Sequence, residues 1–119
     1  MSTASTQMWG TARLVIREGK LEEVKRLVAR ATEIVRTQDP GTIEYAVFVN
    51  AEGTECFVHE RYRDPAAGMA HSANIAPLMA EFLQVCTITG EVCGNPSPEL
   101  RAALEGAGVR VYTPLEVGG

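Results

Sequence analysis

Residues 42–75 determine the fold class, and they begin with two strand-like runs, Thr42-Ile-Glu-Tyr-Ala-Val-Phe-Val-Asn50 and Glu55-Cys-Phe-Val-His-Glu-Arg-Tyr62. Both runs are rich in β-branched and aromatic residues, which favour the pleated, half-buried surface of a sheet. The connecting Asn50-Ala-Glu-Gly53 is typical of a tight turn that is closed by a glycine at positive φ. These features together predict a β-hairpin.

A helix follows the hairpin directly. Asp64 can accept hydrogen bonds from the free N–H groups of its first turn, and Pro65 fits the first helical position, where no N–H is needed. Pro77 removes a helical N–H and clashes with the preceding turn, so we expect the helix to kink or restart between residues 74 and 77. A renewed apolar stripe continues to Cys86.

Two elements precede the hairpin. Residues 8–17 alternate between apolar and more polar side chains, which predicts a strand with one face on a core. Residues 20–38 change to a helical period, with one apolar stripe made of Leu21, Val24, Leu27, Val28, Ala31, Ile34 and Val35. Asp39-Pro40-Gly41 ends this helix and turns the chain into the hairpin.

Three shorter elements follow. Residues 87–93 predict a strand, Ser97 and Pro98 begin a short helix through about Leu104, and residues 109–112 predict a last strand. The order is β-α-β-β-α-β with a helix–strand appendix, which is the ferredoxin-like split βαβ arrangement of an α+β protein. We expect an antiparallel sheet with both main helices on one face. Residues 1–7 would be a flexible lead, 8–94 the domain and 95–119 its C-terminal appendix.

Composition excludes several classes of partner. The 119 residues carry a net charge of −4 and no cluster of Lys and Arg, so a nucleic-acid partner would lack its main electrostatic attraction. The apolar runs are far shorter than the ~20 residues that a membrane span needs. The N-terminus is not typical of a signal peptide, and the odd number of cysteines fits reduced thiols, which we interpret first as small core residues. We therefore expect a cytoplasmic protein.

The register of the hairpin has two candidates. A three-residue turn would place Glu44 opposite Glu60 and Tyr45 opposite His59. A two-residue turn would pair Glu44 with Arg61 and Tyr45 with Glu60, which is electrostatically better. The turn chemistry favours the first register and the charges favour the second.

The predicted sheet has apolar residues on both faces, because neighbours such as Val47 and Phe48, or Phe57 and Val58, point in opposite directions. The two helices cover only one face. The other face needs a partner, and a second copy of the chain is the simplest one. We therefore predict a homodimer in which two sheets meet face to face.

The segment Glu60-Arg-Tyr62-Arg-Asp64-Pro, followed by a helix with Ala70-His71-Ser72-Ala73-Asn74, resembles the antibiotic-biosynthesis monooxygenase-like family of the dimeric α+β barrel superfamily. The resemblance extends from about Met8 to Val92. It implies a ferredoxin-like protomer, a barrel made by two protomers, and a pocket between sheet and helices in each. Known members include oxygenases that need no metal or flavin and act on phenols or quinols, while others cleave haem.

His71 and Asn74 are three residues apart, so they project from one helix face. His71 could exchange a proton with a substrate hydroxyl that Asn74 orients. The alternatives are that Asn74 caps the helix before Pro77 and that His71 satisfies a buried backbone group. Glu60 on an apolar strand face could serve as a base with a raised pKa, or it could pair with Arg13, Arg17 or Arg61.

Four further residues complete the predicted substrate site. Trp9 could stack on an aromatic ligand or fill the dimer core, and Tyr45 and Tyr62 could donate hydroxyl hydrogen bonds or simply pack. We group His59 with them. The two histidines and Glu60 match no common metal-ligand spacing, and no phosphate-binding glycine loop is present, so we expect neither a metal nor another cofactor.

Two functions are consistent with these residues. The first is a cofactor-independent monooxygenase that acts on a phenolic or quinol-type substrate, with His71 as the proton acceptor. The second is a non-catalytic dimeric binding module for a small aromatic metabolite, or a stress-related protein of the same fold.

Overall fold

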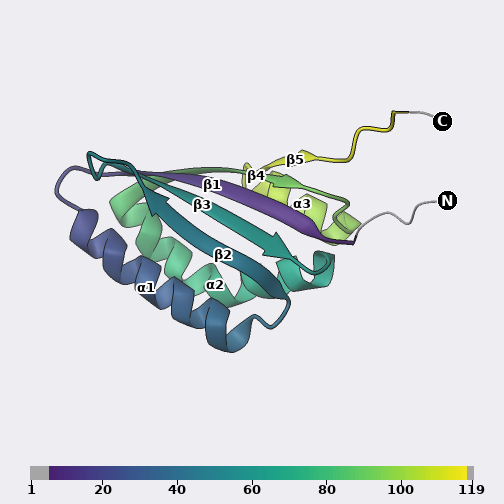
Figure 1. Cartoon of the computed structure of the whole chain (residues 1–119), viewed down its shortest axis with the longest axis horizontal. Coiled ribbons are helices and arrows are strands. Elements are labelled where there is room, and N and C mark those ends of the chain that lie inside the picture. Colours follow the sequence, from purple (N-terminus) through teal and green to yellow (C-terminus); the bar gives the residue numbers. More distant parts are fainter. Residues whose placement is uncertain (1–5, 118–119) are drawn as a thin grey trace.

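The computed structural model describes residues 6–117, which form one sheet layer and one helix layer (Figure 1). Residues 1–5 of the predicted N-terminal lead lie outside the described range. The elements in chain order are β1 (Met8–Ile16), α1 (Leu21–Gln38), β2 (Thr42–Val49), β3 (Glu55–Tyr62), α2 (Pro65–Val85), β4 (Cys86–Cys93), α3 (Pro98–Gly106) and β5 (Arg110–Tyr112).

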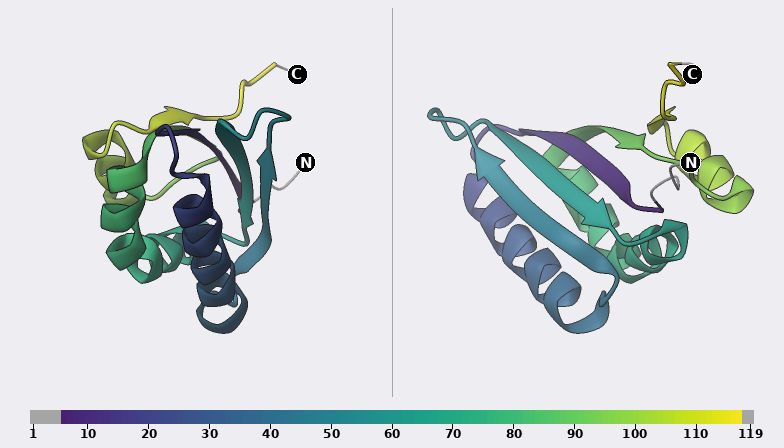
Figure 2. Two further views of the ribbon diagram at one scale, coloured as in Figure 1. Left: turned by 90° about the vertical axis from the view of Figure 1, so that its left-hand side faces the viewer. Right: turned by 45° about the vertical axis from the view of Figure 1, so that its right-hand side comes forward.

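The sheet has the strand order β2-β3-β1-β4-β5. β1 pairs antiparallel with both β3 and β4, which confirms the ferredoxin-like α+β fold. The four strands of the ferredoxin-like core are antiparallel, as predicted, whereas β5 of the C-terminal appendix pairs parallel with β4 and makes the five-stranded sheet mixed. The short α3 crossover explains the difference, because it returns the chain to the same end of the sheet. Figure 2 shows that the sheet curves around the helices without closing into a barrel.

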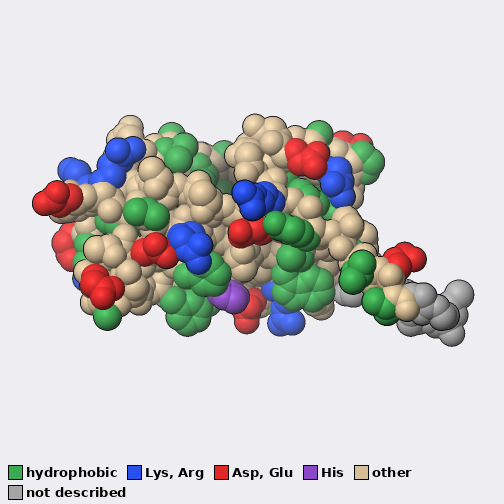
Figure 3. Space-filling model, turned by 90° about the horizontal axis from the view of Figure 1, so that it is seen from above, with side chains coloured by type: hydrophobic (Ala, Val, Ile, Leu, Met, Phe, Trp, Pro, Cys, Tyr) green, Lys and Arg blue, Asp and Glu red, His purple; other side chains and the backbone are tan. Residues whose placement is uncertain are grey.

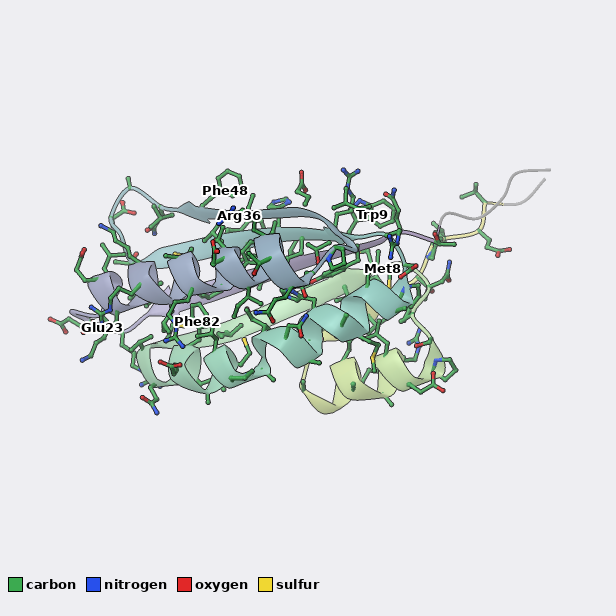
Figure 4. All side chains as sticks on the ribbon, turned by 90° about the horizontal axis from the view of Figure 1, so that it is seen from below. Met8, Trp9, Glu23, Arg36, Phe48 and Phe82 are labelled. Carbon is green, nitrogen blue, oxygen red and sulfur yellow. The ribbon has the colours of Figure 1, made fainter. Side chains whose placement is uncertain are left out.

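One face of the sheet holds the core. Met8, Leu14 and Ile16 of β1 are buried, as their alternation predicts. Val24, Leu27 and Ala31 of α1 pack onto this face, which confirms the apolar stripe. Each large aliphatic side chain that is buried here stabilises the fold by roughly 1.5–3 kcal/mol. Seen from below, α1, α2 and α3 all lie in front of the sheet (Figure 4).

The hairpin adopts the register that the charges favour. Glu44 lies opposite Arg61 and Tyr45 lies opposite Glu60. The three-residue turn is wrong, because the closing pair is Asn50 and Glu55, whose Asn50 N–H donates to the Glu55 carbonyl at 3.0 Å. The Asn50 side chain also accepts hydrogen bonds from two backbone N–H groups of this loop and so stabilises a longer turn. Gly53 has the predicted positive φ, 71°.

α2 begins as predicted, because Asp64 accepts a hydrogen bond from the Ala67 N–H at 2.8 Å. The predicted restart near Pro77 is not seen, since α2 runs without a break from Pro65 to Val85. A proline removes only one N–H, and the buried Ile75 and Leu78 on either side hold the helix against the sheet. The described residues contain no helix that is long and apolar enough to cross a membrane.

The cysteines behave differently from one another. Cys56 and Cys86 are buried and lie in the main core, as predicted for small core residues. Cys93 is exposed at the end of β4, so the same prediction is wrong for it. Its position opposite Trp9 places it on the face of the sheet that the helices leave uncovered.

The connection between α1 and β2 passes very close to α2. Gly41 is buried, and a Cβ atom at this position would collide with the side chain of Ala67 in the first turn of α2. The Arg63 N–H also donates to the Gly41 carbonyl at 2.8 Å. Gly41 therefore fixes the end of α1 against the beginning of α2 and thereby places Asp39, the residue at the C-terminal end of α1.

We expect Gly41→Ala to lower the free energy of unfolding by about 1–3 kcal/mol, because the added methyl group has no room beside Ala67. Urea denaturation followed by circular dichroism measures the change. Gly106→Ala is the matched control, since nothing lies within 4 Å of a Cβ there. That control should be neutral or stabilising, and equal losses in both variants would contradict this account of Gly41.

Candidate active site

A cavity of about 360 Å³ lies between the sheet and α2. This volume is in the range of small-molecule sites. Most of the wall is apolar, and its polar residues gather on β2, β3 and α2. The residues that line it include Tyr45, Glu60, Tyr62, His71, Ser72, Ala76, Leu100, Leu104 and Ala107.

His71 reaches this cavity from the inner side of α2 and is only 6% exposed. Its Nδ1 atom lies 2.7 Å from Asp39 Oδ2. A carboxylate oxygen without a proton can only accept a hydrogen bond. Nδ1 therefore carries a hydrogen and donates a hydrogen bond to Asp39. The other ring nitrogen, Nε2, lies 3.3 Å from Glu60 Oε1. The imidazole is therefore held between two carboxylates, and its alternative role as the partner of a buried backbone group is wrong.

Glu60 lies on β3 with its carboxylate at the cavity. Oε2 accepts a hydrogen bond from the Tyr62 hydroxyl at 2.8 Å, while Oε1 faces His71. Gly10 lies opposite Glu60 on β1, and a Cβ there would come within 3.1 Å of Oε2. The glycine thus leaves room for the carboxylate. The alternative pairing of Glu60 with Arg13 is wrong, because Arg13 pairs with Glu55 at 2.8 Å.

Asp39 is the site residue that the sequence analysis missed. It is 4% exposed and it accepts hydrogen bonds on both oxygens, from His71 and from the Asn74 amide at 2.5 Å. Asn74 therefore orients Asp39 and is not a helix cap. One signal was present: a carboxylate at the C-terminal end of a helix faces the negative end of the helix dipole, which is unfavourable without a specific partner. Its position before Pro40 made an ordinary turn the simpler interpretation.

The electrostatics favour a charged imidazole. Burial lowers the pKa of His71, but the hydrogen bond and negative charge of Glu60, followed by those of Asp39, outweigh it. The pKa of His71 is consequently raised above its ordinary value. The protonated ring is stabilised on both sides, and only the neutral ring, which forms as the pH rises through this raised pKa, can accept a proton.

Two tyrosines surround the histidine. The ring centroids of Tyr45 and Tyr62 lie 5.9 Å and 5.5 Å from that of His71. Burial, and next the charge of Glu60, raise the pKa of both hydroxyl groups well above their ordinary value. Both tyrosines keep their protons and can only act as neutral hydrogen-bond partners.

The structure separates Trp9 and His59 from this cavity, so their assignment to the same substrate site is wrong. His59 is exposed on the opposite face of the sheet, where its ring lies 5.0 Å from that of Phe57 and 6.0 Å from that of Phe48. Trp9 is 43% exposed on the same outer face, opposite Arg61. The strand period of two explains this outcome, because neighbours of inward-facing residues point outward.

The described residues contain no group of three or more His, Cys, Asp or Glu side chains that could hold a metal ion. Within the cavity, the polar side chains instead contact one another in a chain that runs from Asn74 through Asp39, His71 and Glu60 to Tyr62. Such a chain can hold and move a proton at its centre.

We expect Asp39→Asn to lower the pKa of His71, because it removes one of the two negative charges that stabilise the imidazolium. The charged form would then be lost at a lower pH than in the wild type. Titration of the His71 ring signals by NMR measures this shift directly. Glu33→Gln removes an exposed carboxylate from the same helix and should leave the His71 titration unchanged. An unchanged midpoint in Asp39→Asn would contradict the pairing.

Comparison with solved structures supports the fold. MupZ from Pseudomonas fluorescens is 22% identical, with a TM-score of 0.82 over 100% of this chain and 93% of MupZ. Rv0793 from Mycobacterium tuberculosis is 21% identical, with a TM-score of 0.66 over 72% of this chain and 91% of its own. A variant of SnoaB, a cofactor-independent oxygenase from Streptomyces nogalater, is 13% identical, with a TM-score of 0.66. The match covers 73% of this chain and 90% of the SnoaB chain.

No curated protein matches the chain. A family model does match: the model described as antibiotic biosynthesis monooxygenase covers residues 11–84. The matched range contains most of β1, all of α1, β2 and β3, and all of α2 except Val85, and with them every residue of the polar chain around His71. The chain therefore belongs to the antibiotic biosynthesis monooxygenase family.

Proposed function

We propose that this protein is a cofactor-independent monooxygenase that acts on a phenolic or quinol-type aromatic substrate. The observation that carries the proposal is His71, an imidazole held between Asp39 and Glu60 at the wall of a largely apolar cavity. Such a site can bind a flat ring and accept a proton from its hydroxyl group. Membership of a monooxygenase family, and the similarity to SnoaB, support this reaction class.

His71 is the proton acceptor in this mechanism. Its neutral form takes the proton of a substrate hydroxyl at Nε2, the ring nitrogen that faces Glu60 and the cavity. The resulting phenolate is electron-rich and transfers one electron to O₂, and the superoxide and the aryl radical then combine to form a C–O bond. The O–O bond breaks as the proton leaves the same ring carbon. The substrate thus supplies all four electrons: it is oxidised to a quinone, and the second oxygen atom leaves as water. Asp39 and Glu60 stabilise the imidazolium that the transfer creates.

The neighbouring side chains position the reacting groups. Asn74 holds Asp39, and Asp39 in turn fixes the orientation of the His71 ring. The Tyr62 hydroxyl already donates to Glu60. Tyr45, which lines the cavity and keeps its proton, is left to donate a hydrogen bond to the phenolate oxygen. His71, Glu60 and Tyr45 are thus the groups that would touch the substrate.

We expect His71→Ala to lower the rate of oxygen uptake by about 10²–10⁴-fold, the usual contribution of a general base. An oxygen electrode with a panel of quinols and hydroxyanthrones measures the rate on metal-stripped protein. In the wild type the rate should rise with pH through the raised pKa of His71, since only the neutral ring accepts a proton.

Met69→Ala is the matched control, because Met69 is an exposed residue of α2 that does not line the cavity. It should react at the wild-type rate. Tight binding of aromatic ligands without oxygen uptake by the wild type would contradict the oxygenase and favour the non-catalytic binding module.

We also propose that the protein is a homodimer that pairs through the outer face of its sheet. Phe48 is 58% exposed and Trp9 is 43% exposed there, and Phe57 lies between their strands. Seen from above, apolar and charged side chains alternate over the molecule (Figure 3). A single layer of helices leaves this face uncovered, and members of the family are typically dimeric.

We expect Phe48→Glu to convert the dimer into monomers, because it would bury a charge on each side of the interface. Sedimentation equilibrium measures the mass, which should fall from twice that of the chain to that of one chain. Leu83→Glu makes the same change on the exposed side of α2 and should leave the dimer intact. A monomeric wild type would refute the pairing.

A further inference from the structure

The C-terminal helix α3 is built to hold a fixed position. Ser97 accepts a hydrogen bond from the Leu100 N–H at 3.2 Å and so caps its first turn. Leu100 is 2% exposed and packs in a second small core with Met8, Tyr62 and Ala67. The opposite end is tied down by β5, which pairs with β4. The helix is therefore anchored at both ends against the domain.

α3 also forms part of the cavity wall. Leu100, Leu104 and Ala107 all line the cavity, at one-turn intervals along the inner side of the helix. Their exposure increases in this order: Leu100 is buried, Leu104 is half-buried and Ala107 is exposed. The wall thus runs from the interior of the cavity to its surface opening.

The mouth of the cavity lies between α2 and α3. Ser72 and Ala76 are the exposed lining residues of α2, and Ala107 is the exposed lining residue at the end of α3. A ligand that enters between them must pass Leu104, the half-buried side chain on the α3 side. Leu104 is consequently the rim residue of this opening.

The buried part of the α3 wall is Leu100, which lies close to the proton-accepting residues. Leu100 packs in one cluster with Tyr62, whose hydroxyl donates to Glu60. Leu100 also lies against Gly68 of α2, since a Cβ there would be in van der Waals contact with Leu100 Cδ2 at 3.4 Å. A ring that contacts Leu100 is therefore held at a set distance from Glu60 and His71.

The same helix lies outside the segment that the family model matches, which ends at residue 84. The similarity to MupZ covers 100% of this chain, whereas that to SnoaB covers 73% of it. The proton-accepting residues thus belong to the matched segment, and the α3 wall is added to it. An added wall can change which substrates fit without changing the chemistry.

We propose that α3 is the specificity element of this site and that Leu104 sets the largest fused-ring phenol that the cavity accepts. This inference rests on the proposed function, because it takes an aromatic hydroxyl compound as the ligand. A smaller side chain at the rim would lengthen the cavity toward solvent, and a larger one would shorten it. One or two methylene groups in an apolar pocket change selectivity by on the order of 10-fold.

The test compares Leu104→Ala with Leu104→Phe in the full-length chain. Dissociation constants for 2-naphthol and 2-hydroxyanthracene are measured from the fluorescence of each probe, under argon so that no turnover occurs. We expect Leu104→Ala to favour the three-ring probe over the two-ring probe by about 10-fold relative to the wild type, and Leu104→Phe to disfavour it by a similar factor. The two opposite changes remain informative if one variant is poorly folded.

Leu83→Ala and Leu83→Phe are the matched controls, because Leu83 is an exposed leucine of α2 that does not line the cavity. Both should keep the wild-type ratio. If the wild type binds the probes and neither Leu104 variant changes the ratio, the inference is overturned while the proposed function stands. If the wild type binds no aromatic hydroxyl compound and takes up no oxygen, both fall together.

Discussion

The buried carboxylate of Asp39 is the group around which the site is arranged. An unpaired carboxylate in a protein interior destabilises the fold by several kcal/mol, and the end of α1 adds the repulsion of the helix dipole. Two donors from one face of α2 satisfy it: His71 at 2.7 Å and Asn74 at 2.5 Å. The three-residue spacing between these donors is what lets one helix reach both oxygens. The same contacts that make Asp39 tolerable therefore fix the His71 ring at the cavity.

Glycines supply the space that this arrangement needs. Gly41 lets the end of α1 approach the first turn of α2, and Gly10 leaves room on β1 for the Glu60 carboxylate. Neither glycine has a positive φ, so their role is close approach and not backbone conformation. A larger residue at either position would separate groups that must be within hydrogen-bond distance. The site thus depends on the space that Gly10 and Gly41 leave as well as on the polar side chains that occupy it.

The fold could be predicted from the sequence because local signals agreed with it. The alternation at Met8–Ile16, the stripe of α1 and the Asp64-Pro65 start of α2 each correspond to an observed element. The hairpin register could not be predicted, because the side chain of Asn50 stabilises a longer loop than its glycine alone implied.

The site could be predicted only in part. His71, Glu60, Tyr45 and Tyr62 line the cavity as expected, since they lie on inward-facing positions of their elements. Asp39 was missed because its partners are more than thirty residues away in the chain.

Two carboxylates beside one imidazole also determine what the ring can do. The two carboxylates repel each other, and a proton on His71 adds an attraction to each of them that outweighs this repulsion. In the proposed reaction the same negative field would oppose the phenolate that forms beside it, so the phenolate oxygen would need a hydrogen-bond donor of its own. Because the Tyr62 hydroxyl already donates to Glu60, the proposed mechanism gives that role to Tyr45, which keeps its proton.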